Sequence, residues 1–502
     1  MSGPPDEVAA GPRRFVLRLV LVAVALRGVG YALLTPTYEG WDEYQHLAYF
    51  EHLRTNGRPP SLGESFVPQR IFDDLVKEPA PEALKSQAPD VGLRTYAEYW
   101  IEPPVRAARG RAVLYEAQHS IGYYRLQTLI YDPLANHPFL AVRALRLANL
   151  GWTLLGVWLV AVILRRAEVD QRLSECALIL LSVQPLFLMS NVRVANDAMA
   201  FALGAACIVA ALRLQSHTSN PDVGGFLGVV GLVKATAWTQ APATLVLRVR
   251  RPRGLSHALR TSLFFALTLG VALTLEFMRQ GRFAPTQEAW VLAEQGKGLG
   301  DVWRAALSTQ WFDEFARRWG RQMLWVGGWS FAPLPKILPR LHQWILIASL
   351  VPLAIRLWRR ELRDWNFAAF CVLACLGVAA GQALHMAQSK AALGFVATPA
   401  WYAVIALPWL LAGLVWSWGI YERLPSAATT AFFALLLSAE VVGVFFNWLP
   451  TFADSADLAV VVDRCSRLAG GKPLFVLGCA AFVVGWAAAT AALTKALRRG
   501  TA

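Results

Sequence analysis

The sequence predicts an all-α protein that crosses a membrane many times, and three observations support this fold class. Of its 502 residues, 56% are hydrophobic and only 16% are charged, whereas soluble domains are less apolar and about a quarter charged. Apolar runs of about 20 residues recur along the chain, each long enough to cross ~30 Å of hydrocarbon. Short clusters of Lys and Arg flank these runs, as in the cytoplasmic loops of membrane proteins. We therefore expect a bundle of transmembrane helices.

The apolar runs place the individual spans. By the length criterion, spans are expected at roughly residues 15–35, 139–164, 173–191, 196–214, 259–279, 341–358, 366–386, 395–418, 427–447 and 473–494. Residues 225–248 are also apolar, but the basic clusters on both sides of this stretch are assigned to the cytoplasm. The stretch must therefore cross the membrane an even number of times or not at all. Two half-helices that meet near Lys234 satisfy this condition. The prediction is then about 12 transmembrane helices, with both termini in the cytoplasm.

Two long segments fall on the outer side. Residues 36–138 are rich in Pro, charge and aromatic side chains and are too long for a simple connection. Residues 280–340 are also aromatic-rich. We expect short interfacial helices in both external loops, a cytoplasmic tail at residues 1–14, and a single transmembrane domain at 15–502.

Charge and cysteine content exclude two classes of function. The net charge of +14 could suggest nucleic-acid binding, but the basic clusters lie beside apolar runs, as in cytoplasmic loops. Five of the six Cys lie in apolar runs. Cys371 and Cys375 share a helix face, but no His or other Cys nearby completes a zinc site. We expect neither a nucleic-acid partner nor a disulfide framework.

The string "EGWDEYQH" follows the first span and contains the first candidate site. From Trp41 to about Arg54 the chain lacks Gly and Pro, and "NGRPP" follows, so a short helix is predicted. Helical spacing puts Asp42 and His46 on one stripe and Glu43 roughly 100° away. The alternative is an acidic helix N-terminus stabilised by the helix dipole.

Two further segments contain polar candidates. "HSIGYY" places His119, Tyr123 and Tyr124 on a second interfacial helix, where an aromatic belt is the alternative. "SNVRVANDAMA" predicts a turn at the outer mouth of the bundle, and its polar residues are Arg193, Asn196, an N-cap candidate, and Asp197.

Lys234 is the fourth candidate. It lies within an apolar stretch, where an unpaired ammonium costs several kcal/mol, so a function or a buried anion is expected there.

Taken in order, these segments resemble the GT-C type membrane glycosyltransferases, especially a poorly characterised bacterial branch. That group typically has P-x-x-D-E-x-x-H in its first external loop, which Asp42, Glu43 and His46 match. Its H-P-P-L-Y-Y motif is similar to "HSIGYY", although both prolines are missing here.

Later motifs extend the resemblance. The group has N-D at its fourth span, as in Asn196-Asp197, and a glycine-rich run ending in Lys, partly matched by "GGFLGVVGLVKATA" ending at Lys234. The group usually has G-R-Y-x-x-P near its end, but "GFVATP" has Phe395 in place of the Arg. A late arginine that holds the donor phosphate is therefore in doubt, and Lys390 is the nearby substitute.

The resemblance implies a GT-C-like fold and a glycosyltransferase in the inner cell membrane. Its donor would be a sugar on a polyprenyl phosphate within the membrane lipid, and its acceptor a hydroxyl of a glycan, lipid or protein on the periplasmic or exterior face. Asp42 would be the base, with Glu43 and His46 as orienting partners or an alternative base. No cofactor is expected, although related enzymes differ in their need for a divalent metal. The implied substrate-binding residues are His119, Tyr123, Tyr124, Arg193, Asn196, Asp197, Lys234 and Lys390, of which Arg193, Lys234 and Lys390 would face the phosphate.

Two other classes stay open. A transporter or flippase of lipid-linked substrates would show paired broken helices in matching halves of the chain, whereas this sequence has one visible interruption and no symmetry between its halves. A non-catalytic GT-C protein with a degenerate site is the third class.

Overall fold

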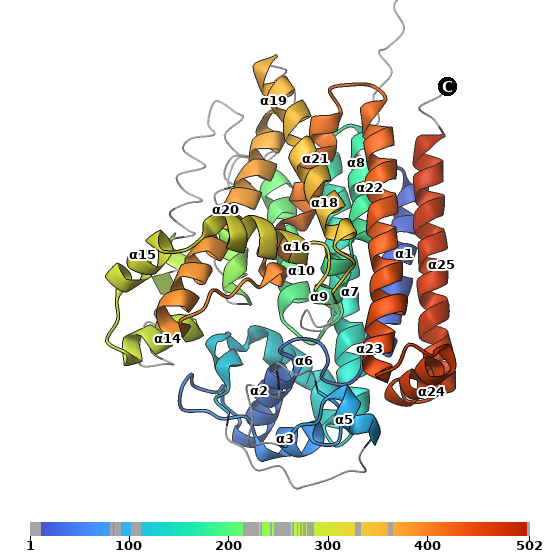
Figure 1. Ribbon diagram of the computed structural model, residues 1–502. Helices are drawn as coiled ribbons and strands as arrows, with labels where there is room; N and C mark the ends of the chain where they lie inside the picture. The colour runs from blue at the N-terminus through green and yellow to red at the C-terminus, as the bar shows by residue number, and fades with distance from the viewer. Residues whose placement is uncertain are drawn as a thin grey trace, which may run out of the picture.

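The computed structural model describes residues 12–80, 92–101, 112–213, 233–240, 286–326, 333–359 and 365–498, with isolated positions between 84 and 278. Within these residues the chain is helical, and β pairing is limited to an isolated bridge between Phe66 and Val113. Long helices run side by side, and shorter helices gather at the end of the bundle opposite to the C-terminus (Figure 1). The all-α prediction is confirmed.

Seven segments of the described chain are long and apolar enough to cross a membrane. They are α1 (Arg14–Leu34), α7 (Pro138–Arg166), α18 and α19 (Ile337–Ala348 and Leu350–Trp358), α20 (Trp365–Leu393), η5 with α21 (Ala400–Ala406 and Leu407–Trp418), α22 with η6 and α23 (Leu424–Val441, Val442–Trp448 and Leu449–Ala453), and α25 (Lys472–Leu497).

The predicted count of about 12 is not confirmed. Helices α8 (Gln171–Val183) and α9 (Pro185–Val192) make an eighth span if counted together, and they meet at a 60° bend. Pro185 cannot donate a backbone hydrogen bond, which explains the break. Helix α10 (Asp197–Arg213) is apolar but too short for the length criterion. Most of the predicted span 259–279 and of the 225–248 stretch lies outside the described residues, which include η3 (Ala235–Gln240).

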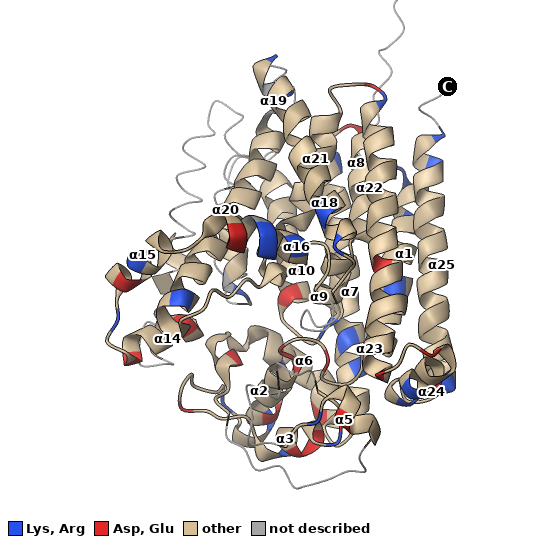
Figure 2. Ribbon diagram, viewed as in Figure 1, with Lys and Arg blue, Asp and Glu red and all other residues tan. Residues whose placement is uncertain are grey.

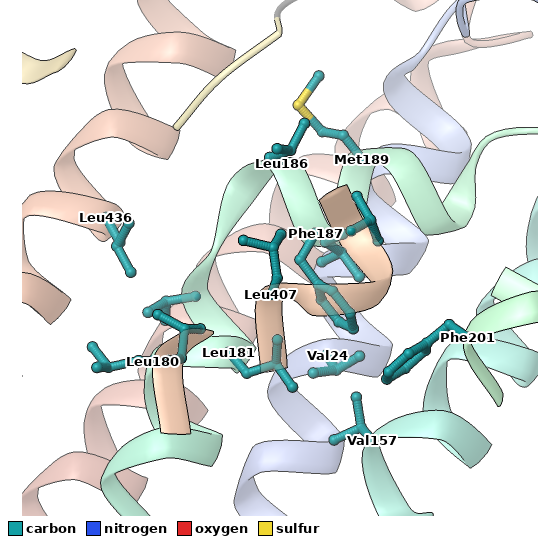
Figure 3. Close-up of a cluster of buried hydrophobic side chains, with 14 of the residues drawn as sticks. Val24, Val157, Leu180, Leu181, Leu186, Phe187, Met189, Phe201, Leu407 and Leu436 are labelled. Carbon is teal, nitrogen blue, oxygen red and sulfur yellow. The ribbon is translucent and has the colours of Figure 1, made fainter. Parts of the chain in front are cut away.

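The centre of the bundle is built from α1, α7, α8, α9 and α21. Figure 3 shows Val24, Val157, Leu181, Phe187 and Leu407 from these helices converging on one apolar cluster.

Close contact between α1 and α25 depends on glycine. An added Cβ at Gly485 would lie 2.7 Å from the side chain of Arg27. Arg27 is itself fully buried and donates through Nε to Glu440 Oε2 at 2.7 Å, while Tyr31 donates to Glu440 Oε1 at 2.8 Å. Burial of an unpaired charge would be costly, so this pair explains how α1 and α22 tolerate ionisable residues within their spans.

The two predicted external segments form the shorter helices. The first contains α2 (Glu43–Asn56), α3 (Gln69–Leu75), α5 (Tyr96–Ile101), η2 (Tyr115–Gln118) and α6 (Ile121–Leu134), which enclose an apolar cluster of their own. The second contains α14 (Gln287–Glu294), α15 (Leu299–Leu307), η4 (Phe312–Trp319) and α16 (Gly320–Gln322), and its helices α14 and α15 pack against α20. Many of the charged residues lie in these helices and in α24 (Leu458–Leu468), whereas the long helices carry few (Figure 2).

Candidate active site

A cavity of about 680 Å³ lies between the two groups of short helices. Its lining comes from the start of α2, from residues 112–118, from α14 and α16, and from the chain between His385 and Tyr402. The volume is within the range of roughly 300–1,000 Å³ that is usual for small-ligand sites. Of the residues predicted to be catalytic, Asp42 lines this cavity.

Asp42 lies immediately before α2 in a left-handed backbone conformation, with φ 65° and ψ 0°. Asp and Asn adopt this conformation more readily than other non-glycine residues. The Asp42 side chain makes no capping hydrogen bond to α2. Instead, its Oδ1 accepts a hydrogen bond from the hydroxyl of Tyr115. The Asp42 side chain therefore does not cap α2 by a hydrogen bond.

The environment of Asp42 makes it a stronger base than an ordinary Asp. Burial raises its pKa to about 6, and the negative charge of Glu116 contributes to the rise. Arg193, the Tyr115 hydrogen bond and Lys234 act in the opposite direction and limit the shift. Asp42 is thus ionised at neutral pH and still basic enough to accept a proton, as a general base must be.

Glu43 is directed elsewhere, into the protein interior. Its side chain is fully buried and accepts hydrogen bonds from Nε and Nη2 of Arg146, at 2.8 and 2.6 Å. The backbone N–H groups of Gly40 and Val194 also donate to it, at 3.1 and 2.9 Å. The two adjacent acids therefore differ in environment: Asp42 borders the cavity, and Glu43 joins the start of α2 to α7 and to the α9–α10 turn.

His46 and Tyr124 lie behind the cavity wall. His46 Nδ1 and the Tyr124 hydroxyl share a hydrogen bond of 2.8 Å, and burial lowers the pKa of His46 to about 3, so the ring is neutral. His119 Nε2 lies 2.7 Å from Glu116 Oε2. Burial alone would raise the pKa of Glu116, but the contact with His119 and the positive charge of Lys234 oppose this effect, and that pKa lies below its usual value. Glu116 therefore presents a negative charge to the cavity.

Tyr123 and Asn196 have structural partners. Tyr123 donates to Asn149 Oδ1 at 3.3 Å, and the side-chain amide of Asn196 donates to the Val233 carbonyl at 2.7 Å. Neither residue lines the cavity.

Two of the three predicted phosphate partners, Arg193 and Lys234, form a charged group with Asp197 beside the cavity. Asp197 accepts from Arg193 Nη2 at 2.8 Å and from Lys234 Nζ at 2.6 Å, so Lys234 has the anion that its apolar sequence context demanded. Arg193 also donates to the Trp41 carbonyl at 2.7 Å, and Lys234 Nζ lies 5.4 Å from the ring centre of Tyr402. These contacts bring Arg193, Asp197 and Lys234 together directly behind the wall.

Lys390 is separate from this group. Its Nζ donates to the Ser308 carbonyl at 2.6 Å, which attaches the end of α20 to the end of α15. Phe395, at the position where the related motif has Arg, lines the cavity with 60% of its surface exposed.

Sequence reasoning missed six titratable residues of the lining, which are Tyr44, Tyr115, Glu116, Glu288, His385 and Tyr402. Tyr115 and Glu116 lie four and three residues before His119, within the aromatic and acidic string "YEAQH", which was the available signal. Glu288 and His385 had no signal, because they meet only through the packing of α14 on α20, with Glu288 Oε2 3.8 Å from His385 Nδ1. Among the described residues, no three His, Cys, Asp or Glu side chains are grouped as metal ligands.

Comparison with known proteins gives little. No protein-family model matches this chain, and no curated protein matches it. Among solved structures, the chain is similar to the archaeal oligosaccharyltransferase AglB from Archaeoglobus fulgidus in complex with an inhibitory peptide and a dolichol-phosphate, at 12% sequence identity and a TM-score of 0.38. The match covers 88% of this chain and 56% of that chain. A similarity this low assigns neither a family nor an activity.

Proposed function

We propose that the protein is a GT-C type membrane glycosyltransferase that moves a sugar from a polyprenyl-phosphate donor to an acceptor hydroxyl on the outer face of the membrane. One observation carries the proposal: the carboxylate of Asp42, with its pKa raised to about 6, lines a cavity beside the long apolar helices. Such a place suits a substrate with a lipid tail and a polar head. The proposed step uses no metal ion or other cofactor.

The reaction requires one bond to form and one to break. The acceptor oxygen attacks the anomeric carbon, and a glycosidic C–O bond forms. The bond from the anomeric carbon to the phosphate oxygen breaks, and its electron pair leaves with the polyprenyl phosphate. Asp42 takes the proton of the acceptor hydroxyl as general base and later releases it to water.

Arg193 and Lys234 are the proposed stabilisers of the leaving phosphate. With Asp197 between them, the group has two positive charges and one negative charge, so one positive charge is in excess. Both cations lower the pKa of Asp42, which means that their field acts in the cavity. Fixed positive charge in a site of low dielectric favours the developing negative charge of a leaving group.

The other predicted residues receive supporting roles. Glu43 positions Asp42 through its pairing with Arg146. His46, His119 and the two tyrosines hold the wall that carries Glu116. Lys390 stays a predicted phosphate partner, although its ammonium would have to leave the Ser308 carbonyl to reach the cavity.

A transporter of lipid-linked substrates is the second candidate, and the 60° break between α8 and α9 favours it, because discontinuous helices often line transport sites. Purified protein in liposomes, supplied with a panel of polyprenyl-phosphate sugars and mixed acceptors, separates the candidates. Mass spectrometry should find free polyprenyl phosphate and glycosylated acceptor in equal amounts. Movement of an intact donor between leaflets, or no change of any donor, would contradict the proposal.

A further inference from the structure

A second polar part of the cavity wall plays no role in the proposed proton transfer. Glu288 of α14 is 8% exposed, and its carboxylate faces the imidazole of His385 on α20 at 3.8 Å. His385 meets Tyr402 edge-on, with ring centroids 5.1 Å apart. Trp401 and Gln322 complete this part of the lining. We name these five residues, Glu288, Gln322, His385, Trp401 and Tyr402, the acceptor wall.

The cavity lining has many polar groups, whereas a typical small-ligand pocket has a small number of them among hydrophobic and aromatic side chains. The described lining includes three carboxylates, four glutamine amides and five aromatic rings, whereas its branched aliphatic side chains are limited to Val113 and Leu393. An isoprenoid alcohol or an apolar peptide side chain would leave most of these carboxylate and amide groups without a hydrogen-bond partner.

Free hydrogen-bonding capacity is present at Gln322. Its Oε1 is buried without a hydrogen-bond partner among the described residues, although Gln322 lines the cavity. A buried amide oxygen that lacks a partner costs free energy. If the Gln322 side chain turns this oxygen toward the cavity, a ligand hydroxyl can donate to it and remove that cost. The Glu288 carboxylate also lines the cavity and can accept hydrogen bonds from a ligand, and hydrogen bonds to a charged acceptor are the stronger kind.

We infer that the acceptor wall binds the acceptor and that this acceptor is a carbohydrate. A sugar ring has hydroxyl groups at its rim, which match the carboxylate and amide oxygens, and weakly positive C–H groups on its faces, which match the negative faces of aromatic rings. The cavity of about 680 Å³ has room for a short saccharide. The inference rests on the proposed function, because the carbohydrate is the acceptor whose hydroxyl gives its proton to Asp42. A peptide acceptor and a lipid acceptor are the competing outcomes.

Binding without a donor tests the acceptor wall directly. Protein in nanodiscs is titrated with methyl glycosides of neutral di- to tetrasaccharides, followed by calorimetry and saturation-transfer NMR. Glu288→Gln should weaken binding about 10- to 100-fold, because hydrogen bonds to a charged acceptor are lost, with an unchanged Tm. Glu294→Gln, at the exposed end of the same helix, is the matched control and should bind as the parent does. No saccharide binding by the parent, or equal binding by Glu288→Gln, would overturn the inference.

Turnover then separates this inference from the proposed function. With donor present, Glu288→Gln should raise the KM for the saccharide about tenfold and leave kcat unchanged, whereas a purely structural role would lower Tm or kcat. Donor consumption that requires a peptide or a polyprenol instead of a saccharide would keep the transferase and overturn the carbohydrate acceptor. Saccharide binding with no donor consumed in any mixture would keep the acceptor wall as a carbohydrate site and refute the transferase.

Discussion

The hydrogen bond from Tyr115 to Asp42 gives the account a quantitative test. Asp42 must be ionised to act as base, so turnover should fall as the pH drops through about 6, the pKa that burial and Glu116 produce. Tyr115→Phe removes a donor to the ionised carboxylate and keeps the ring. Since that hydrogen bond holds the pKa of Asp42 down, the substitution should move the acidic limb of the pH–rate profile to higher pH.

The magnitude follows from the kind of bond. A hydrogen bond to a charged group contributes about 1.5–3 kcal/mol, and one pKa unit corresponds to about 1.36 kcal/mol. The acidic limb of the pH–rate profile should therefore move to higher pH by about one to two units, from about pH 6 to about pH 7–8. At pH 6 the ionised fraction of Asp42 would fall from about one half to about one tenth or less. At pH 9 both proteins should turn over at similar rates.

The assay is donor consumption by mass spectrometry between pH 5 and pH 9, with protein in nanodiscs. Tyr421→Phe, at a half-exposed tyrosine in the turn between α21 and α22, is the matched control and should keep the parent profile. An acidic limb that stays in place in Tyr115→Phe, or that moves to lower pH, would refute the assignment of this limb to Asp42.

Three other substitutions have defined outcomes. Glu116→Gln removes the negative charge that helps to raise the pKa of Asp42, so the acidic limb should move to lower pH in the same assay. Arg146→Met leaves the Glu43 carboxylate buried without its partner, which should lower the free energy of unfolding by about 3–5 kcal/mol. The Tm measured by differential scanning fluorimetry should fall accordingly. Glu43→Gln combined with Arg146→Met should recover most of the lost stability. Lys234→Met removes a cation from the proposed phosphate site and should lower kcat about 10²- to 10³-fold, measured at saturating donor and acceptor.

Exposed residues supply the controls for these variants. Glu64→Gln, Arg125→Ala and Lys336→Met change charge at solvent-facing positions and should leave pH profile, Tm and kcat near the parent values. An acidic limb at higher pH in Glu116→Gln, an unchanged Tm in Arg146→Met, or full activity in Lys234→Met would each contradict the role assigned to that residue.

The sequence is informative about elements whose signal is local. Long apolar runs predicted the seven segments that can span a membrane, since span length is set by bilayer thickness alone. The helix expected from Trp41 to about Arg54 is found at Glu43–Asn56, because the end signal "NGRPP" is a local one. Broken helices were harder to predict: the bend at Pro185 lies inside an apolar run that otherwise reads as continuous.

The site was predictable only in part, because its contacts are long-range. The pairing of Glu43 with Arg146 joins residues 103 positions apart, and nothing in "WDEYQH" distinguishes the acid that faces the cavity from the acid that is buried. Asp42 has a left-handed backbone and its side chain accepts from Tyr115 instead of capping α2, which helical periodicity could not foresee. Glu288 and His385 become neighbours only when α14 packs on α20.

The central claim is that Asp42 is the base of a lipid-dependent sugar transfer, and one comparison tests it most directly. Asp42→Asn keeps the size of the side chain and the tolerance for a left-handed backbone, and its amide oxygen can still accept from Tyr115, but an amide cannot take a proton. The measurement is the turnover of polyprenyl-phosphate sugars by the parent, by Asp42→Asn and by the exposed-site control Asp132→Asn, with Tm recorded for each. We predict that Asp42→Asn loses about 10²- to 10⁴-fold in turnover, the usual contribution of general base catalysis, while its Tm and the activity of Asp132→Asn stay at the parent level. Turnover by Asp42→Asn equal to that of the parent would contradict the claim.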